Sequence, residues 1–234
     1  MLHLINTAAM DATLSTGGYN RIMSSRNNGF DSLIVAADQA LRTLTNPPAA
    51  LQSSPAAQVT DSALNTKDQR TSIELMRVNH AGEISAQALY RGQSILARSP
   101  DTKRHLLQAA SEEQDHLAWC SERLTELGGR PSLLDPLWYA GSFLVGLVAG
   151  AAGDKISLGF VTETERQVET HLQDHLSRLP KSDAKSISIL RRMAEDEAHH
   201  GTTARLAGGV DLPLPIRSAM TFGGNLLRRF SLWG

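Results

Sequence analysis

Two Glu-x-x-His motifs constrain the fold of this chain more than any other feature. They are Glu113–His116 and Glu197–His200, and each lies in the middle of a stripe of apolar residues with helical spacing. The stripes contain Leu106, Ala109, Cys120, Leu124 and Leu127 around the first motif, and Ile189, Met193, Ala204 and Ala207 around the second. Each motif is therefore predicted to point a carboxylate and an imidazole into the core of a helical protein.

Two further helical stripes each carry one carboxylate, at Glu83 and at Glu165. The two halves of the chain repeat this order, because Glu83 precedes Glu113 by 30 residues and Glu165 precedes Glu197 by 32. A buried carboxylate without a partner is costly, and four in one core would be hard to sustain. Divalent metal ions would neutralise them.

One Glu from each of two helices and one Glu-x-x-His from each of two others form the ligand set of di-iron and di-manganese bundles. The sequence therefore predicts six metal ligands, which are Glu83, Glu113, His116, Glu165, Glu197 and His200. Carboxylate-rich ligation with one imidazole per metal favours iron or manganese over zinc or copper. The register of the last helix stays open, since Asp196 and His199 are also three residues apart. The alternative is that all six belong to solvated helix faces, but each lies inside an apolar stripe.

Proline, glycine and serine divide the chain into an all-α four-helix bundle with additional helical segments at both ends. Four long helical regions with short connections predict the bundle, and the third of them has its expected break at residues 150–153. The predicted parts are a disordered extension at 1–28, a short amphipathic helix at 29–45, a linker at 46–70, the bundle at 71–209 and an amphipathic, membrane-associated tail at 210–234.

Composition excludes several classes of protein. A chain of 234 residues with 41% hydrophobic and 20% charged residues is globular, and its net charge of −1 gives no field that would attract nucleic acid. The single cysteine, Cys120, forms no internal disulfide, which fits a reducing cytoplasm. Residues 136–153 carry no formal charge, but they are short for a membrane span and contain four glycines, so we expect a buried or interface-lying helix.

Other polar residues close to the predicted ligands have less certain roles by sequence alone. His171 lies six residues after Glu165 and is predicted to hydrogen-bond to a ligand or to carry a proton. Tyr90 is predicted as a core residue, although its hydroxyl could reach the site. The acidic neighbours of the ligands are predicted to lie on the surface or to touch a ligand from outside; these are Glu112, Glu163 and Glu195.

The residues around the predicted ligands resemble the demethoxyubiquinone hydroxylase family, in particular its bacterial branch. The resemblance is carried by the runs that end at Glu83 (LMRVNHAGE), Cys120 (EEQDHLAWC) and Glu165 (SLGFVTETE), and it covers about residue 30 to the C-terminus. It implies a ferritin-like four-helix bundle with two iron ions as cofactors, and it puts the six predicted residues at the family's metal-ligand positions. Where animal members have His followed by Tyr, this chain has His171 followed by Leu172, so a redox relay through that tyrosine is not carried over.

The resemblance also implies an activity, which is O2-dependent hydroxylation of the ring of a polyprenyl-methyl-methoxy-benzoquinol in ubiquinone biosynthesis. The implied partners are this quinol, membrane lipid and an electron donor that the sequence does not identify. Homo-oligomers or other ubiquinone-biosynthesis proteins are further candidates, and nucleic acid is not. The implied location is peripheral, on the cytoplasmic face of the cell membrane. The alternatives are a ferritin- or rubrerythrin-like protein that handles iron or peroxide, and a helical interaction module without a metal.

Overall fold

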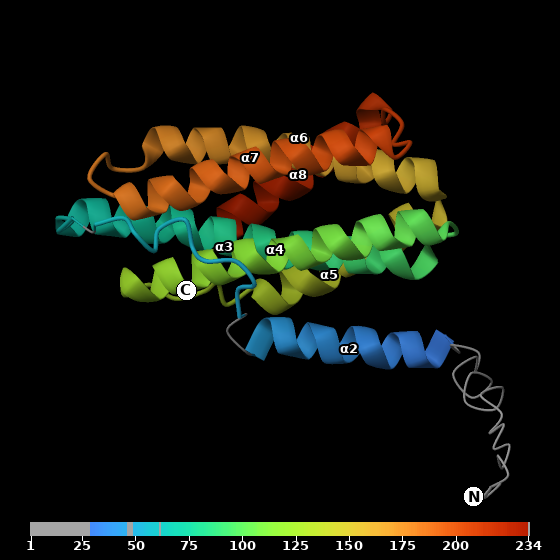
Figure 1. Ribbon diagram of the computed structural model, residues 1–234, viewed down its shortest axis with the longest axis horizontal. Helices are drawn as coiled ribbons and strands as arrows, with labels where there is room; N and C mark the ends of the chain where they lie inside the picture. Colours follow the sequence, from blue (N-terminus) through green and yellow to red (C-terminus); the bar gives the residue numbers. More distant parts are fainter. Residues whose placement is uncertain (1–28, 46–48, 61, 234) are drawn as a thin grey trace, which may run out of the picture. The chain divides into compact units, whose positions relative to one another are not determined.

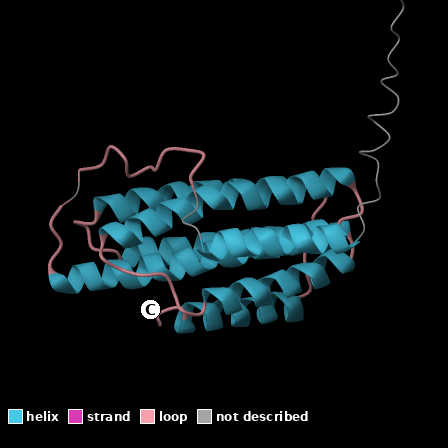
Figure 2. Ribbon diagram, turned by 90° about the horizontal axis from the view of Figure 1, so that it is seen from below, coloured by secondary structure: helices cyan, strands magenta, loops and turns pink. Residues whose placement is uncertain are grey.

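The structure of this chain is a computed structural model that describes residues 29–45, 49–60 and 62–233. The predicted disordered extension at 1–28 lies outside the described residues. The chain divides into two compact units, Met1–Val35 and Ala36–Gly234, and the boundary between them falls within helix α2 (Gly29–Thr45). The described part contains helices and no strands (Figure 2), so the prediction of an all-α protein is confirmed.

Four long helices form the core of the second unit. They are α3 (Thr66–Leu96), α4 (Pro100–Glu126), α6 (Asp154–Arg178) and α7 (Ala184–Leu206). Helix α3 packs along α4, and α6 packs along α7; the two pairs meet where α4 contacts α7 and α3 contacts α6 (Figure 1). This arrangement is the predicted four-helix bundle.

The helix ends follow from capping residues. Helix α3 begins at Thr66, several residues before the predicted start of the bundle, because the Asn65 side chain accepts hydrogen bonds from the backbone N–H groups of residues 67 and 68. Ser99 caps α4 in the same way, and Pro100 occupies its first turn. The expected break in the third helical region separates α5 (Asp135–Ala151) from α6, and Gly153 between them has a φ of 105°.

The segment predicted as a linker makes specific contacts with the bundle. The Leu51 N–H donates to the Asp115 carboxylate, and both Trp119 Nε1 and the Ser188 hydroxyl donate to backbone carbonyls of this segment. Ala56 is buried in the apolar core. The segment is therefore more than a spacer, because it supplies hydrogen-bond partners to polar groups of α4 and α7.

Helix α5 packs closely on α3, and its other face is uncovered. A Cβ atom on Gly146 would lie only 2.2 Å from the backbone oxygen of Leu89, so the close approach of these helices requires glycine. Leu137, Leu144 and Val148 are 60%, 61% and 72% exposed. Among the described residues, no helix has the length and apolar character that crossing a membrane requires.

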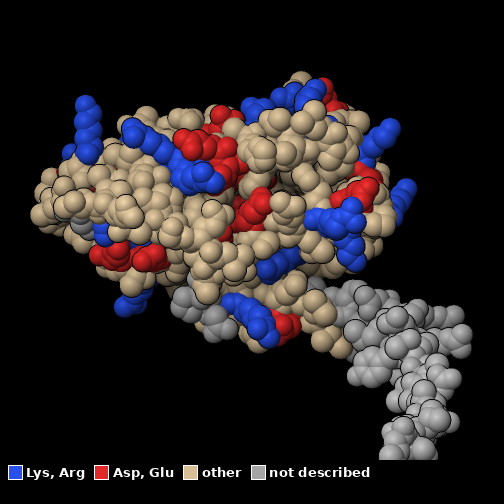
Figure 3. Space-filling model, in the orientation of Figure 1, with Lys and Arg blue, Asp and Glu red and all other residues tan. Residues whose placement is uncertain are grey.

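Helix α8 (Leu214–Phe230) lies against α3 and α6 (Figure 1) but contains no buried residue. Its apolar side chains stay largely uncovered, with Leu214 73% and Phe222 69% exposed. Lys and Arg side chains are interspersed with Asp and Glu side chains on the face of the molecule shown in Figure 3.

Candidate metal centre

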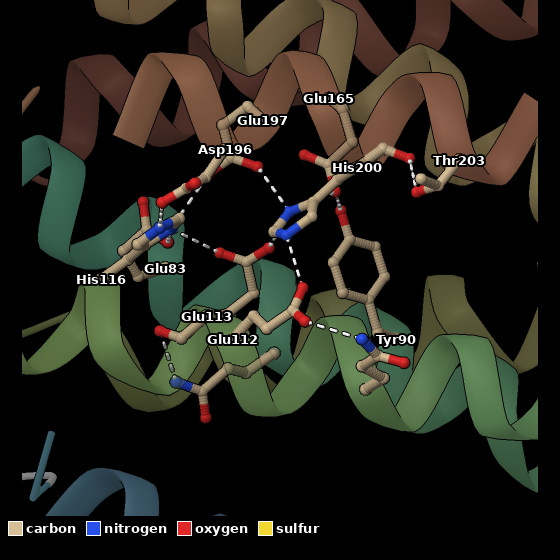
Figure 4. Close-up of polar contacts among 12 residues, drawn as sticks. Glu83, Tyr90, Glu112, Glu113, His116, Glu165, Asp196, Glu197, His200 and Thr203 are labelled. Atoms are coloured by element: carbon tan, nitrogen blue, oxygen red, sulfur yellow. Dashed lines mark hydrogen bonds and ion pairs between the residues drawn. The ribbon is translucent and has the colours of Figure 1, made fainter. Parts of the chain in front are cut away.

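The six predicted ligands converge in one layer of the bundle (Figure 4). All are buried, with exposures between 0% for Glu113 and 6% for His200. Their ligand atoms form two groups, each within 4.8 Å: Glu83, Glu113, His116 and Glu197 in the first, and Glu113, Glu165, Glu197 and His200 in the second. Glu113 and Glu197 belong to both groups, as two metal ions bridged by two carboxylates would require.

The helix periodicity explains why these side chains meet. Each ligand lies within the inward stripe of its helix, and two apolar clusters lie on the same stripes. The first cluster includes Met76, Cys120, Leu172 and Met193, and the second includes Tyr90, Leu106, Val161 and Ala204. Along the helices, these residues lie on opposite sides of the ligands, so the polar layer is enclosed by apolar side chains that exclude water.

The structure settles the open register of α7. Glu197 and His200 are buried, whereas His199 is exposed and Asp196 is partly exposed. Glu197 and His200 therefore face the layer, whereas the side chain of His199 faces solvent and Asp196 contacts His116 from outside.

Each imidazole points one nitrogen at the carboxylates of the layer. His116 Nδ1 lies 3.1 Å from Glu113 and 3.2 Å from Glu197. His200 Nδ1 lies 3.4 Å from Glu113 and 3.3 Å from Glu197. Both imidazoles therefore offer the same nitrogen to the two shared carboxylates.

The outward nitrogen of each imidazole contacts a carboxylate from the opposite helix. His116 of α4 has its Nε2 atom 3.2 Å from Asp196 of α7, and His200 of α7 has its Nε2 atom 2.7 Å from Glu112 of α4 (Figure 4). Both acidic residues immediately precede the glutamate of a Glu-x-x-His motif. Such outer partners fix the orientation and tautomer of a metal-binding histidine.

Tyr90 contributes a hydroxyl to the layer, which was the alternative to the core-packing role that the sequence favoured. Its side chain is fully buried, and its hydroxyl donates a short hydrogen bond to Glu165 Oε1 (Figure 4). Burial and the nearby charge of Glu165 raise the pKa of Tyr90 well above its usual value, so the phenol stays protonated and donates. The signal in the sequence was its position, seven residues after Glu83 on the same stripe.

His171 lies elsewhere than predicted. Its ring packs edge-on against that of His175, with centroids 3.8 Å apart, and His175 Nδ1 lies 3.0 Å from the side-chain oxygen of Asn79. Burial, His175 and the positive charge of Arg228 lower the pKa of His171 to about 2. Among the described residues, no hydrogen bond joins His171 to a predicted ligand, and its ring contact is with His175.

The electrostatics of the layer favour a cation. Burial raises the pKa of Glu83 and of Glu165 well above the usual value. Burial opposes ionisation of Glu113 as well, but hydrogen bonds from His116 and His200 bring its pKa below the usual value. The pKa of His200 is raised to about 12, since hydrogen bonds to Glu113 and Glu197 outweigh the effect of burial.

Two buried oxygens provide the test of whether a metal fits. Glu83 Oε2 and Glu113 Oε1 have no partner in hydrogen-bond geometry among the described residues, although buried polar atoms are almost always paired. His116 Nδ1 is 3.7 Å from the first oxygen, and His200 Nδ1 is 3.4 Å from the second. Both oxygens belong to residues of the first four-ligand group. Four carboxylates and two imidazoles form an oxygen-rich donor set that suits iron or manganese, so the residues fit a pair of such ions.

A surface groove between α6 and α7 reaches the layer. It has a volume of about 420 Å³ and is lined on α7 by Glu197, Gly201 and Arg205, and on α6 by Gly159 and Glu163 among others. A Cβ atom on Gly201 would lie 3.3 Å from the Cβ atom of Glu165. Only a small residue therefore separates this groove from the Glu165 side chain.

The fold and the buried layer together define a class, which is a ferritin-like helical bundle with a carboxylate- and histidine-rich candidate metal centre. Comparison with known proteins is consistent with this class. Residues 70–226 match the family described as Ubiquinone biosynthesis protein COQ7, so the chain belongs to that family.

Relatives from several bacteria share most of the chain. A protein from Legionella pneumophila (strain Paris) is 53% identical over 211 residues, which cover 89% of this chain and 99% of the relative. A protein from Acinetobacter baylyi is 52% identical over 205 residues, with 88% and 97% covered, and one from Nitrosospira multiformis is 50% identical over 204 residues, with 87% and 98% covered. All three relatives are named 3-demethoxyubiquinol 3-hydroxylase.

Proposed function

We propose that this chain is a di-iron monooxygenase that hydroxylates the ring of 3-demethoxyubiquinol, a polyprenyl-methyl-methoxy-benzoquinol, in ubiquinone biosynthesis. The observation that carries the proposal is the pair of overlapping four-ligand groups, which share Glu113 and Glu197, in a member of the COQ7 family. Bacterial relatives named for this reaction match the chain over almost their whole length. These comparisons support the hydroxylase and give no support to the alternative of a ferritin- or rubrerythrin-like protein.

The reaction places three demands on the protein. One oxygen atom of O2 enters the ring and the other leaves as water, so two electrons must come from a donor and two protons from the surroundings. A pair of ferrous ions would bind O2 and pass on these electrons when bound. The protein must hold the ions, exclude bulk water and leave space for the quinol.

The residues of the layer meet the first two demands. Glu83 with His116 and Glu165 with His200 would hold one ion each, together with Glu113 and Glu197, which belong to both four-ligand groups. Asp196 and Glu112 orient the two imidazoles from outside. Apolar residues on both sides of the layer exclude water. The groove between α6 and α7 is a candidate opening towards Glu197.

A genetic experiment tests the function. Deletion of the gene, in a strain without any flavin-dependent hydroxylase for the same step, should make aerobic cells accumulate the demethoxy quinone and lose ubiquinone. The wild-type gene should restore ubiquinone, whereas Glu113→Ala should not, because both four-ligand groups lose a member. The control is Glu195→Ala, an exposed residue of α7 that should restore ubiquinone fully. Normal ubiquinone in the deletion strain would contradict the proposal.

We also propose that the chain binds peripherally to the cytoplasmic face of the cell membrane. A polyprenyl quinol resides in lipid, so an enzyme that acts on it gains from contact with the bilayer. The support from the structure is the uncovered apolar surface of α5 and α8, with the exposed Arg229 at the end of α8 suited to anionic head groups.

Vesicle flotation tests this location. The wild-type protein should float with vesicles that contain phosphatidylglycerol. The double variant Phe222→Ser, Leu226→Ser should bind several-fold more weakly, because it removes two exposed apolar side chains from α8. Ser218→Ala changes an exposed polar residue of the same helix and should bind like the wild type. Equal binding of the double variant and the wild type would exclude α8 as the membrane contact.

A further inference from the structure

The two candidate metal positions come from repeated halves of the chain but differ in one hydrogen bond. Glu83 on α3 belongs to one four-ligand group, and Glu165 on α6 belongs to the other. Glu165 Oε1 accepts a hydrogen bond from the Tyr90 hydroxyl. Glu83 Oε2 has no hydrogen-bond partner among the described residues, and the nearby imidazole nitrogen, His116 Nδ1, is 3.7 Å away. The single glutamates of the two halves are thus in different environments.

The sequence shows the origin of this difference. Tyr90 follows Glu83 by seven residues, which is about two helical turns. The matching position in the second half, seven residues after Glu165, is Leu172. Leu172 is 1% exposed and packs in the apolar cluster with Met76 and Cys120. A leucine side chain has no hydrogen to donate, so the second half lacks a counterpart of the Tyr90 hydroxyl.

Other outer contacts are shared by both positions. Each imidazole has one carboxylate on its outward nitrogen, Asp196 for His116 and Glu112 for His200. Each imidazole also faces the same two shared glutamates. The hydrogen bond from the Tyr90 hydroxyl to Glu165 is therefore the contact that distinguishes the two positions.

We propose that Tyr90 makes the two metal positions unequal, so that the ion held by Glu165 and His200 binds more weakly than the ion held by Glu83 and His116. The hydroxyl stabilises Glu165 in the absence of metal and occupies one of its oxygens. An oxygen that accepts this hydrogen bond can still bind a metal, but the hydrogen bond withdraws electron density from it, so Glu165 is a weaker donor than Glu83, whose Oε2 accepts no hydrogen bond among the described residues. Tyr90 is a positioning residue in this account, which depends on the metal centre proposed above.

Equilibrium metal titration tests this proposal without measuring activity. Metal-free protein is titrated with Fe2+ under anaerobic conditions, or with Mn2+ followed by electron paramagnetic resonance, in competition with a chelator. The wild-type protein should bind two ions in two steps separated by about tenfold or more in affinity. Tyr90→Phe keeps the buried ring and removes the hydroxyl, so it should strengthen the weaker step by about tenfold, equivalent to about 1.4 kcal/mol, and leave the tighter step unchanged.

Tyr139→Phe is the matched control. Tyr139 is also buried, at 5% exposed, and its hydroxyl has no hydrogen-bond partner among the described residues, but it lies on α5 and outside both four-ligand groups. This variant should leave both binding steps unchanged. Circular dichroism of each variant establishes that the helices have formed.

Two charge-removing variants assign the steps. Glu165→Gln should abolish the weaker step, and Glu83→Gln should abolish the tighter one. These variants establish which position binds more weakly even if Tyr90→Phe does not fold. A single step in the wild type, an unchanged gap in Tyr90→Phe, or loss of the tighter step in Glu165→Gln would overturn the proposal. Absence of any binding in the wild type would instead contradict the metal centre itself.

Discussion

Asp196 and Glu112 contact the outward nitrogens of His116 and His200, and these contacts lead to a quantitative prediction for Asp196→Asn. Asp196 Oδ2 lies 3.2 Å from His116 Nε2, and hydrogen bonds to charged groups contribute about 1.5–3 kcal/mol. The Asp196 side chain is 22% exposed and also pairs with Arg192 at 2.9 Å, and asparagine can still accept a hydrogen bond. We therefore expect a loss at the lower end, about 1–1.4 kcal/mol, which weakens one metal-binding step five- to tenfold.

The same titration with a competing chelator measures this loss. Asp196→Asn should weaken the step assigned to Glu83 and His116, while Glu112→Gln should weaken the other step, because Glu112 contacts His200 at 2.7 Å. Glu195→Gln, at an exposed position next to Asp196, is the control and should change neither affinity. If both affinities in Asp196→Asn stayed within twofold of the wild type, the outer carboxylate would not orient His116 and the reasoning would be wrong.

Two further predictions concern packing and pH. Gly146→Ala should lower the free energy of unfolding in urea by about 2 kcal/mol or more, because its Cβ atom would meet the Leu89 oxygen. The control is Gly141→Ala, whose Cβ atom has nothing within 4 Å and which should be near neutral. Equal effects of the two variants would refute the close helix contact. Burial and the charge of Arg178 lower the pKa of His175 to about 3. Between about pH 3 and 6.5, His175 is therefore protonated in the unfolded chain but not in the folded protein. The free energy of unfolding should fall as the pH drops below 6.5, by up to about 1.4 kcal/mol per pH unit. His171, whose pKa is lowered to about 2, contributes with the same sign, so His175→Gln should reduce the slope between pH 6.5 and 5 without abolishing it. An unchanged slope would show that His175 is not buried in its neutral form.

Much of the fold and site was predictable because helical periodicity directly encodes which residues face the core. The apolar stripes around the six predicted ligands predicted the four helices and the inward direction of these side chains. Repetition of the pattern in two halves predicted that the stripes converge. The register of α7 was ambiguous because Asp196 also lies three residues before a histidine, and only packing distinguishes the buried residues from their neighbours.

Contacts between helices were beyond the reach of a pattern within one helix. The hydrogen bond from Tyr90 to Glu165 joins α3 to α6, and the contact of Asp196 with His116 joins α7 to α4. Both depend on how the helices are aligned along the bundle, which spacing within a single helix does not determine. The ring contact of His171 with His175, one turn further along α6, also depends on side-chain packing that the spacing from Glu165 did not indicate.

The contacts of the predicted linker could not be predicted for a different reason. Its composition of Pro, Ser, Ala and Thr is typical of a spacer, and composition contains no information on backbone hydrogen bonds. In the structure, backbone groups of this segment form hydrogen bonds with the side chains of Asp115 and Trp119. These backbone groups do not depend on residue type, so composition does not reveal the contacts.

Oxygen transfer by the iron-loaded protein tests the central claim most directly. The purified chain should bind about two iron atoms. In a single turnover with reduced iron, a short-chain 3-demethoxyubiquinol and isotopically labelled O2, the hydroxylated product should carry one labelled oxygen on the ring. Glu113→Ala should yield almost no product under the same conditions, because both four-ligand groups lose a member. Unlabelled product, or equal yield from Glu113→Ala and the wild type, would contradict the proposed di-iron hydroxylase.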